Sequence, residues 1–132
     1  MSSSSHIANE DIPEGFQIYE KRLSPAGLSF RKDDAISFVR SSDGWLELEH
    51  EPSNNHDKNA IKVIGCNKGL FWTKRRFVGY LPKEVSKNII DNGFLALVRA
   101  RLIKTYVGND GYIEIIFQLL GPEGRKKEYK NS

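Results

Sequence analysis

Residues 51–63 read EPSNNHDKNAIKV, and residues 77–83 read FVGYLPK. The first segment gathers Asn, His and Asp side chains within residues 54–59, directly before a short apolar run. Small polar side chains of this kind favour turns because they hydrogen-bond their own backbone. The segment therefore predicts a tight polar turn that leads into a strand over residues 59–64. Such a turn can also direct several donors and acceptors at one ligand.

The second segment predicts a strand over residues 77–81 that runs into a helix over residues 82–92. Pro82 suits the first position of this helix, and Gly93 suits a left-handed C-terminal cap. A spacing of four gives the helix one apolar face, made by Leu81, Val85 and Ile89.

The rest of the chain alternates strand patterns with one further helix. Residues 32–40 predict a short helix with acidic residues in its first turn, and residues 108–111, GNDG, predict a hairpin turn. Strands are expected over residues 16–23, 26–31, 45–50, 94–102 and 112–120, with a linking segment at 67–76. Because no strand–helix–strand repeat appears, we expect a mainly β fold with two short helices. Its antiparallel sheet should curl into a small OB-like or SH3-like β-barrel.

The expected domain organisation is a single folded unit with two flexible ends. Residues 1–15, rich in Ser and poor in apolar side chains, predict a flexible N-terminal arm. Residues 16–121 form the expected domain, and residues 122–132 a basic flexible tail. Four phenylalanines are expected in the core: Phe38, Phe77, Phe94 and Phe117.

Composition narrows the class of protein. A hydrophobic content of 39% with 28% charged residues is ordinary for a globular domain, and no apolar run approaches the length of a membrane span. The first residues lack the pattern of a secretory signal, so a cytoplasmic location is the default expectation. With Cys66 as the one cysteine, no intramolecular disulfide can form, and we expect this residue to be a small apolar filler or to lie in the loop that follows. The net charge of +3 does not by itself identify a nucleic-acid partner.

The histidines and nearby acids are the candidates for a catalytic or metal site. His50, His56 and Asp57 are suitable metal ligands, but His50 falls on a strand and no fourth ligand is apparent. A hydrolase built from His56, Asp57 and a serine lacks a nucleophile elbow. No catalytic residue, metal or cofactor is therefore expected, and a metal-dependent nuclease is the least favoured alternative.

The two opening segments resemble the HIRAN domain, which is found at the N-terminus of some SNF2-type DNA remodellers and alone in bacterial and phage proteins. The resemblance is carried by EPxNxxDxNAIxV at residues 51–63 and VGYLP at residues 78–82, and it extends over residues 16–121. It implies a compact OB-like barrel. In HIRAN domains of the remodellers, aromatic side chains sandwich the terminal bases of single-stranded DNA, and an Asp accepts a hydrogen bond from the 3′ hydroxyl.

Carried across by position, the resemblance implies a nucleic-acid-binding site made by Phe30, Asn54, His56, Asp57, Tyr80, Lys83 and Tyr112. Asp57 would read the terminal hydroxyl, and aromatic faces would stack on bases. Lys83, in the first turn of a helix, suits a phosphate. Phosphate contacts are also expected from Arg31, Arg99 and Arg101.

The function expected from this site is non-catalytic binding of single-stranded DNA at free 3′-OH ends, in processes such as DNA repair or replication. Because the chain has no motor motif, a helicase or nuclease partner would supply any further activity. Two alternatives stay open. Asp57 and Asn59 can serve only to tie the turn to its own backbone. The domain can also bind protein instead, through the aromatic segment 70–72.

Overall fold

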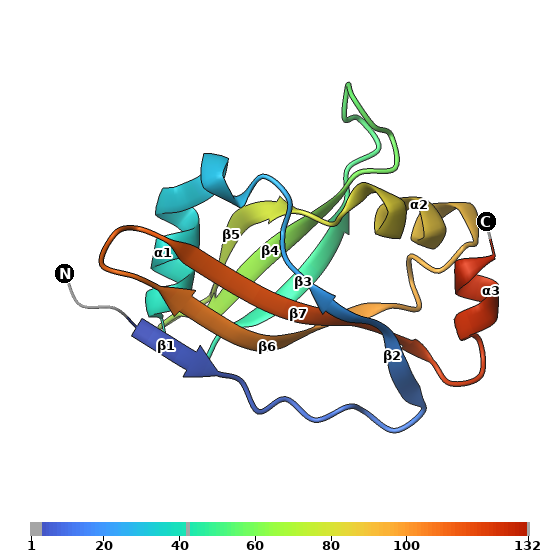
Figure 1. Cartoon of the computed structure of the whole chain (residues 1–132), viewed down its shortest axis with the longest axis horizontal. Coiled ribbons are helices and arrows are strands. Elements are labelled where there is room, and N and C mark those ends of the chain that lie inside the picture. Colours follow the sequence, from blue (N-terminus) through green and yellow to red (C-terminus); the bar gives the residue numbers. More distant parts are fainter. Residues whose placement is uncertain (1–3, 42, 132) are drawn as a thin grey trace.

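The structure is a computed structural model that describes residues 4–41 and 43–131. Residues 1–3 of the expected arm, Ser42 and Ser132 lie outside the described residues. Within the described ranges the chain forms seven strands, three α-helices and one short 3₁₀ helix (Figure 1). In chain order they are β1 (Ser4–Ile7), β2 (Phe16–Leu23), η1 (Leu28–Arg31), α1 (Lys32–Arg40), β3 (Trp45–His50), β4 (Ile61–Lys68), β5 (Thr73–Tyr80), α2 (Lys83–Asp91), β6 (Arg99–Val107), β7 (Ile113–Pro122) and α3 (Lys126–Lys130).

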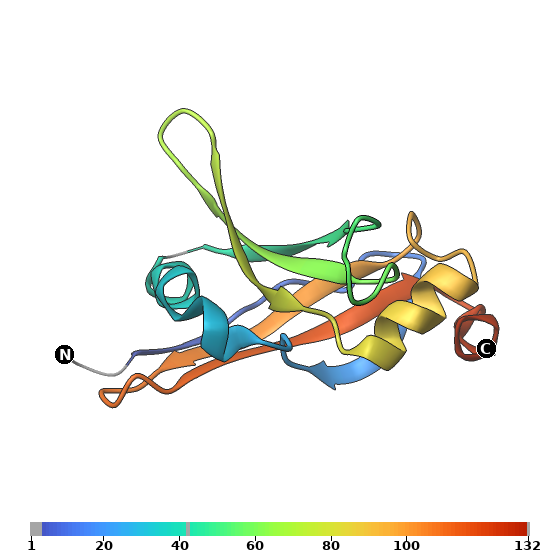
Figure 2. The same ribbon diagram turned by 90° about the horizontal axis from the view of Figure 1, so that it is seen from above.

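Two antiparallel sheets face each other. One has the strand order β1-β6-β7-β2 and the other the order β3-β4-β5. Figure 2 shows them as two layers, with α1 at the end where the β6–β7 hairpin turns and α2 at the opposite end. None of the helices in the described ranges is long and apolar enough to cross a lipid bilayer.

Alternation of apolar residues along the strands builds the core between the layers. In β7, Ile113, Ile115, Phe117 and Leu119 are all buried, as the sequence pattern predicts. Across from them lie buried residues of the three-stranded sheet, namely Leu46, Ile61, Val63 and Val78. Apolar side chains of α1 and α2 close the two ends of the core: Phe38, Val85 and Ile89.

The predicted fold class is confirmed, although the sheets do not close into a barrel. In the described part of the chain, an isolated β-bridge between Ala26 and Tyr80 joins the segment after β2 to the end of β5. Gly79 makes this bridge possible. Its φ is 156°, and a Cβ added there would lie 2.7 Å from both the Ala26 carbonyl oxygen and Pro25 Cβ.

Three expected segments differ in the structure. The strand expected over residues 26–31 is wrong because Gly27 adopts a left-handed conformation, with φ 76°, and the chain then turns into η1. The strand expected over residues 94–102 begins only at Arg99, after a turn that buries Phe94. The segment 67–76, expected as a linker, extends β4 and β5 into a long hairpin.

The two ends also pack against the domain, unlike the flexible arm and tail that the sequence predicts. Strand β1 pairs with β6. In α3 the Tyr129 side chain is fully buried, with its ring centroid 4.9 Å from that of Tyr19 and 6.0 Å from that of Phe94. The Tyr129 hydroxyl donates a 2.8 Å hydrogen bond to Glu20. Burial of the Tyr129 ring therefore holds the C-terminal segment against the domain. The basic composition of this segment does not indicate that contact.

Candidate nucleic-acid interface

The turn between β3 and β4 is held by its own side chains. Asn54 Oδ1 accepts hydrogen bonds of 2.9 Å from the backbone N–H groups of His56 and Asp57. Asp57 Oδ1 in turn accepts a 2.9 Å bond from the backbone N–H of Asn59. Asp57 therefore ties the turn to its own backbone through Oδ1. Its other carboxylate oxygen, Oδ2, receives no hydrogen bond from any described residue and stays open to a ligand.

Glu51 ties this turn to strand β5. Its Oε1 accepts hydrogen bonds from Asn54 Nδ2 at 2.7 Å and from the Tyr80 hydroxyl at 2.8 Å, and its Oε2 lies 3.0 Å from Lys62 Nζ. The hydrogen bonds from Asn54, Tyr80 and Lys62 lower the pKa of Glu51 to about 2. Sequence reasoning missed this role, although Glu51 opens the motif at residues 51–63.

A bulge places two aromatic rings on one face of the three-stranded sheet. Residues three apart on a regular strand point to opposite faces, but the β4–β5 register shifts between Val63 and Ile64, so Phe77 and Tyr80 share a face. Their rings meet edge to face with centroids 5.0 Å apart. Phe77, expected in the core, is therefore only half-buried, and the Arg31 guanidinium lies 4.1 Å from its ring centroid.

Five of the seven residues predicted for the site come together beside α2. A depression of about 320 Å³ lies between the turn and the helix, lined by Ala26, Asn54, His56, Asp57, Ala60, Tyr80, Leu81 and Lys83. A second depression of about 350 Å³ adjoins it and shares Asp57 and Lys83, its other lining residues being Asn59, Glu84 and Lys87. We refer to the two together as the groove.

Opposite charges line the groove without pairing. Lys83 is the first residue of α2, where its exposed ammonium group adds to the positive end of the helix dipole. In the described part of the chain Lys83 forms no ion pair, with Asp57 or any other acid. The groove can therefore accept an anion at Lys83 and a hydrogen-bond donor at Asp57 Oδ2 at the same time.

The two other predicted aromatics lie outside the groove. Phe30 is 88% exposed on η1, four residues after the groove residue Ala26. Tyr112 is 56% exposed at the β6–β7 turn, with its ring centroid 6.0 Å from that of Tyr106. Neither ring lines the groove, so sequence spacing alone did not show which aromatics meet.

Of the three arginines predicted to contact phosphates, one adjoins the groove and two do not. Arg31 adjoins the groove through the ring of Phe77, which contacts Tyr80. Arg99 and Arg101 belong to β6 in the other sheet and do not line the groove. Arg99 stacks 4.5 Å from the Phe16 ring centroid, and Arg101 donates hydrogen bonds to the Glu10 carbonyl and to Gln118.

Of the three residues considered for metal binding, His56 and Asp57 line the groove and His50 does not. His50 Nε2 lies 2.8 Å from the Lys58 carbonyl oxygen, whereas His56 faces the groove. The described residues hold no cluster of three or more His, Cys, Asp or Glu side chains suited to a metal ion. Cys66 is fully buried, as expected, and burial raises the pKa of its thiol to about 11.

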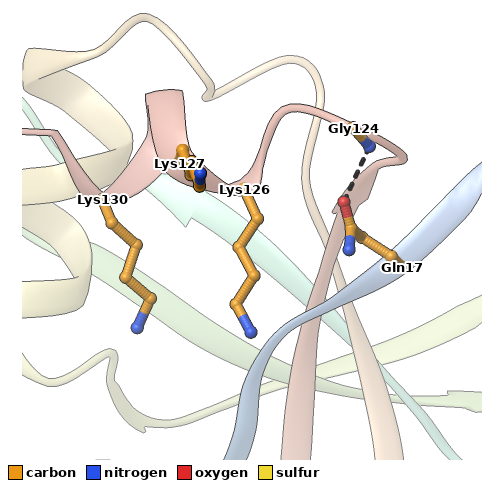
Figure 3. Close-up of a pocket in the computed structure, with 5 residues that line it drawn as sticks. All are labelled: Gln17, Gly124, Lys126, Lys127 and Lys130. Atoms are coloured by element: carbon orange, nitrogen blue, oxygen red, sulfur yellow. Dashed lines mark hydrogen bonds between the residues drawn. The ribbon is translucent and has the colours of Figure 1, made fainter.

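A further depression, of about 650 Å³, lies beside α3 and is lined by Gln17, Gly124, Lys126, Lys127 and Lys130. Figure 3 shows Lys126 and Lys130 extending to the same side of the chain, with the Gln17 side chain bonded to the Gly124 N–H. Lys130 Nζ forms an ion pair with Glu20 Oε2 at 3.3 Å. No residue of the predicted site lines this depression.

Comparison with known proteins agrees with the resemblance seen in the motifs. The family model of the HIRAN domain matches residues 23–109. The chain belongs to the HIRAN domain family. No curated protein matches the chain.

Solved structures share the HIRAN fold. The NMR structure of the HLTF HIRAN domain has a TM-score of 0.51 and 21% identity, and the match covers 89% of this chain and 88% of that one. The crystal structure of the HIRAN domain of human HLTF has a TM-score of 0.47 and 20% identity, with 89% of each chain covered. The NMR structure of the HLTF HIRAN domain in its DNA-bound conformation has a TM-score of 0.49 and 21% identity, with 89% of this chain and 84% of that chain covered.

Proposed function

We propose that this HIRAN domain is a non-catalytic module that binds single-stranded DNA and captures a free 3′ end. The observation that carries the proposal is that one groove holds two groups without a partner among the described residues, Asp57 Oδ2 and the Lys83 ammonium. The resemblance between residues 51–63 and the DNA-binding HIRAN domains of the remodellers supports the same reading.

A terminal nucleotide fits these two groups better than an internal one. Its 3′ hydroxyl offers a donor to Asp57, and its 5′ phosphate offers an anion to Lys83. An internal nucleotide offers only phosphodiesters, which a carboxylate repels. The carboxylate would therefore select for chain ends as well as bind them.

The walls of the groove suit bases. Tyr80 presents an aromatic ring that is held in place by contacts with Glu51 and Phe77. The exposed His56 ring, directly before Asp57 in sequence, also lines the groove. Aromatic stacking contributes about 1–3 kcal/mol per base in single-strand binders. Phe30, 88% exposed and four residues after Ala26, would extend this platform once DNA is bound.

A role in DNA repair or replication belongs to the same proposal. The domain would hold a strand end for a partner such as a helicase or nuclease, and its groove would supply the recognition. We place the domain in the cytoplasm in this scheme.

Fluorescence anisotropy with short oligonucleotides tests end capture. Oligonucleotides with a 3′ hydroxyl should bind more tightly than the same sequence with a 3′ phosphate. Asp57→Asn keeps an oxygen that can accept from Asn59 but replaces the acceptor at Oδ2 with an amide group. It should weaken binding of the 3′-hydroxyl strand roughly ten- to 100-fold, the factor for one hydrogen bond to a charged group.

Lys21→Ala is the matched control, because Lys21 is exposed on β2, away from the groove. It should bind like the wild type. Equal affinity of the wild type for both strand ends would refute end capture, and absence of binding at low salt would refute single-strand binding altogether.

A further inference from the structure

The tip of the β4–β5 hairpin is a defined turn. The Gly69 N–H donates a 2.9 Å hydrogen bond to the Trp72 carbonyl, closing the four residues between the last pair of the ladder, Lys68 and Thr73. A Cβ at Gly69 would collide with that carbonyl oxygen, so the turn needs glycine. Leu70, Phe71 and Trp72 are therefore presented by a fixed backbone.

These three side chains make the most prominent apolar surface of the described residues. They are 90%, 82% and 73% exposed, and the rings of Phe71 and Trp72 lie with centroids 6.2 Å apart. Figure 2 shows the end of the hairpin extending beyond the rest of the domain, and no described residue buries its tip. We call residues 70–72 the apolar tip. An exposed group of large apolar side chains indicates a binding surface.

Uncompensated positive charge lies next to the apolar tip. Arg75 is bonded to Glu47 and Glu49, and Arg76 lies 3.9 Å from Asp34. The other two basic residues near the tip, Lys68 and Lys74, are exposed and form no ion pair with a described residue. The surface thus combines aromatic rings with free ammonium groups, which is complementary to stacked bases bordered by phosphates.

Strand β5 connects the apolar tip directly to the groove. It runs from Thr73 to Tyr80, a distance of roughly 23 Å at 3.3 Å per residue. That distance equals about seven base steps at the B-form rise of 3.4 Å, and fewer in an extended strand. Arg31 and Phe77 lie beside this path, next to the groove. A strand whose end sits in the groove can therefore reach the tip within a few nucleotides.

We propose that the apolar tip is a second nucleic-acid contact, which packs against the first base pair of a duplex whose 3′ single-stranded tail lies in the groove. The proposal rests on the proposed function and assigns its substrate class, a 3′-tailed duplex. Apolar side chains that wedge against base steps, with nearby cations on the phosphates, are an established way to engage a duplex. A protein partner would use the apolar residues but would not require the two free lysines.

The test compares three fluorescent DNAs: a single strand, the same strand as a 3′ tail on a short duplex closed by a hairpin loop, and the matching 5′-tailed duplex. The wild type should bind the 3′-tailed duplex about tenfold more tightly than the single strand, the factor that corresponds to 1.4 kcal/mol. Phe71→Ala and Trp72→Ala should remove this preference and leave single-strand affinity unchanged. Leu95→Ala, at an exposed apolar residue outside the hairpin, should behave like the wild type.

A base analogue placed at the first base pair gives a direct reading. Its fluorescence should change when wild-type protein binds, because the aromatic rings of the apolar tip would contact that base pair, and should stay unchanged with Phe71→Ala. Equal wild-type affinity for the single strand and the 3′-tailed duplex would overturn the tip proposal while leaving end capture intact. Absence of binding to every DNA would instead refute the proposed function.

Two further results would reassign the apolar tip. Binding to vesicles of phosphatidylserine and phosphatidylcholine that is lost in Trp72→Ala, with the duplex preference intact, would make it a membrane contact. Equal loss of single-strand and duplex affinity in Phe71→Ala would make it part of the single-strand site.

Discussion

The Tyr80 hydroxyl donates a 2.8 Å hydrogen bond to Glu51 Oε1, although the two residues are 29 positions apart. This bond connects the two sequence segments that carry the family resemblance. Glu51 opens the first segment, and Tyr80 stands at the centre of the second. The groove therefore depends on a contact between the segments as well as on the turn.

Tyr80→Phe should separate the two roles of Tyr80. The substitution keeps the ring and its contact with Phe77 but removes one donor from Glu51, so the turn should become less stable and affinity for single-stranded DNA should fall by less than about tenfold. Tyr80→Ala also removes the stacking face, worth about 1–3 kcal/mol per base, and should weaken binding further. Anisotropy gives the affinities and thermal melting the stability. Equal effects of both substitutions would show that the ring does not contact DNA.

Glu51 should make the domain sensitive to acid. Its pKa is about 2 in the folded state and 4.5 in the unfolded reference, so the unfolded chain binds more protons between these values. The stabilisation from Glu51 should be complete above about pH 4.5 and be lost as the pH falls towards 2. Glu51→Gln should lower the melting temperature at pH 7 and flatten its dependence on pH in this window.

The control for this experiment is Glu123→Gln, at an exposed acid after β7. Its melting profile from pH 2 to 7 should follow that of the wild type. A Glu51→Gln profile parallel to the wild type throughout the window would contradict the assignment.

Lys83→Ala should change the salt dependence of DNA binding. A single-strand contact with one phosphate contributes about −0.7 to the slope of log K against log salt concentration. Removal of the Lys83 ammonium group should therefore make the slope less steep by about 0.7, whereas Lys21→Ala should leave it unchanged. The measurement is anisotropy at several salt concentrations, and an unaltered slope in Lys83→Ala would place the phosphate elsewhere.

Tyr129→Ala should show that α3 is part of the folded domain. The buried ring contacts Tyr19 and Phe94, and truncation of a large core aromatic costs about 3–5 kcal/mol of unfolding free energy. Tyr129→Phe keeps the ring but loses the hydrogen bond from the hydroxyl to the Glu20 carboxylate, and should cost about 1.5–3 kcal/mol, the range for a hydrogen bond to a charged group. Urea denaturation measures both, with the exposed Tyr112→Ala as control. A loss below 1 kcal/mol in Tyr129→Ala would support a flexible tail.

Local signals made much of the fold predictable. Pro82 and Gly93 bracket a helix, which the structure places at Lys83–Asp91, and the GNDG turn at residues 108–111 joins β6 to β7. The polar turn was predictable for the same reason, because Asn54 and Asp57 bond to backbone groups only two or three residues away. Each of these features is decided within a few residues of itself.

Long-range contacts were not predictable from the pattern. The β-bulge that turns Phe77 to the face of Tyr80 depends on the pairing of two strands, so the sequence of β5 alone does not show that Phe77, expected in the core, lies on that face. Burial of Tyr129 depends on Tyr19, far away in sequence. The resemblance placed Phe30 in one site with Tyr80, but the left-handed Gly27 turns the chain before Phe30, which does not line the groove.

The bridge between Ala26 and Tyr80, with hydrogen bonds of 2.7 and 2.9 Å, lies on the seam where the two sheets meet, and both residues line the groove. A ligand in the groove would contact residues on both sides of that seam and hold the two sheets together. Occupancy would thus slow amide hydrogen exchange in β2 as well as in β5, including at positions the ligand never touches. If the groove binds a DNA strand as proposed, the same contacts should also raise the unfolding free energy of both sheets.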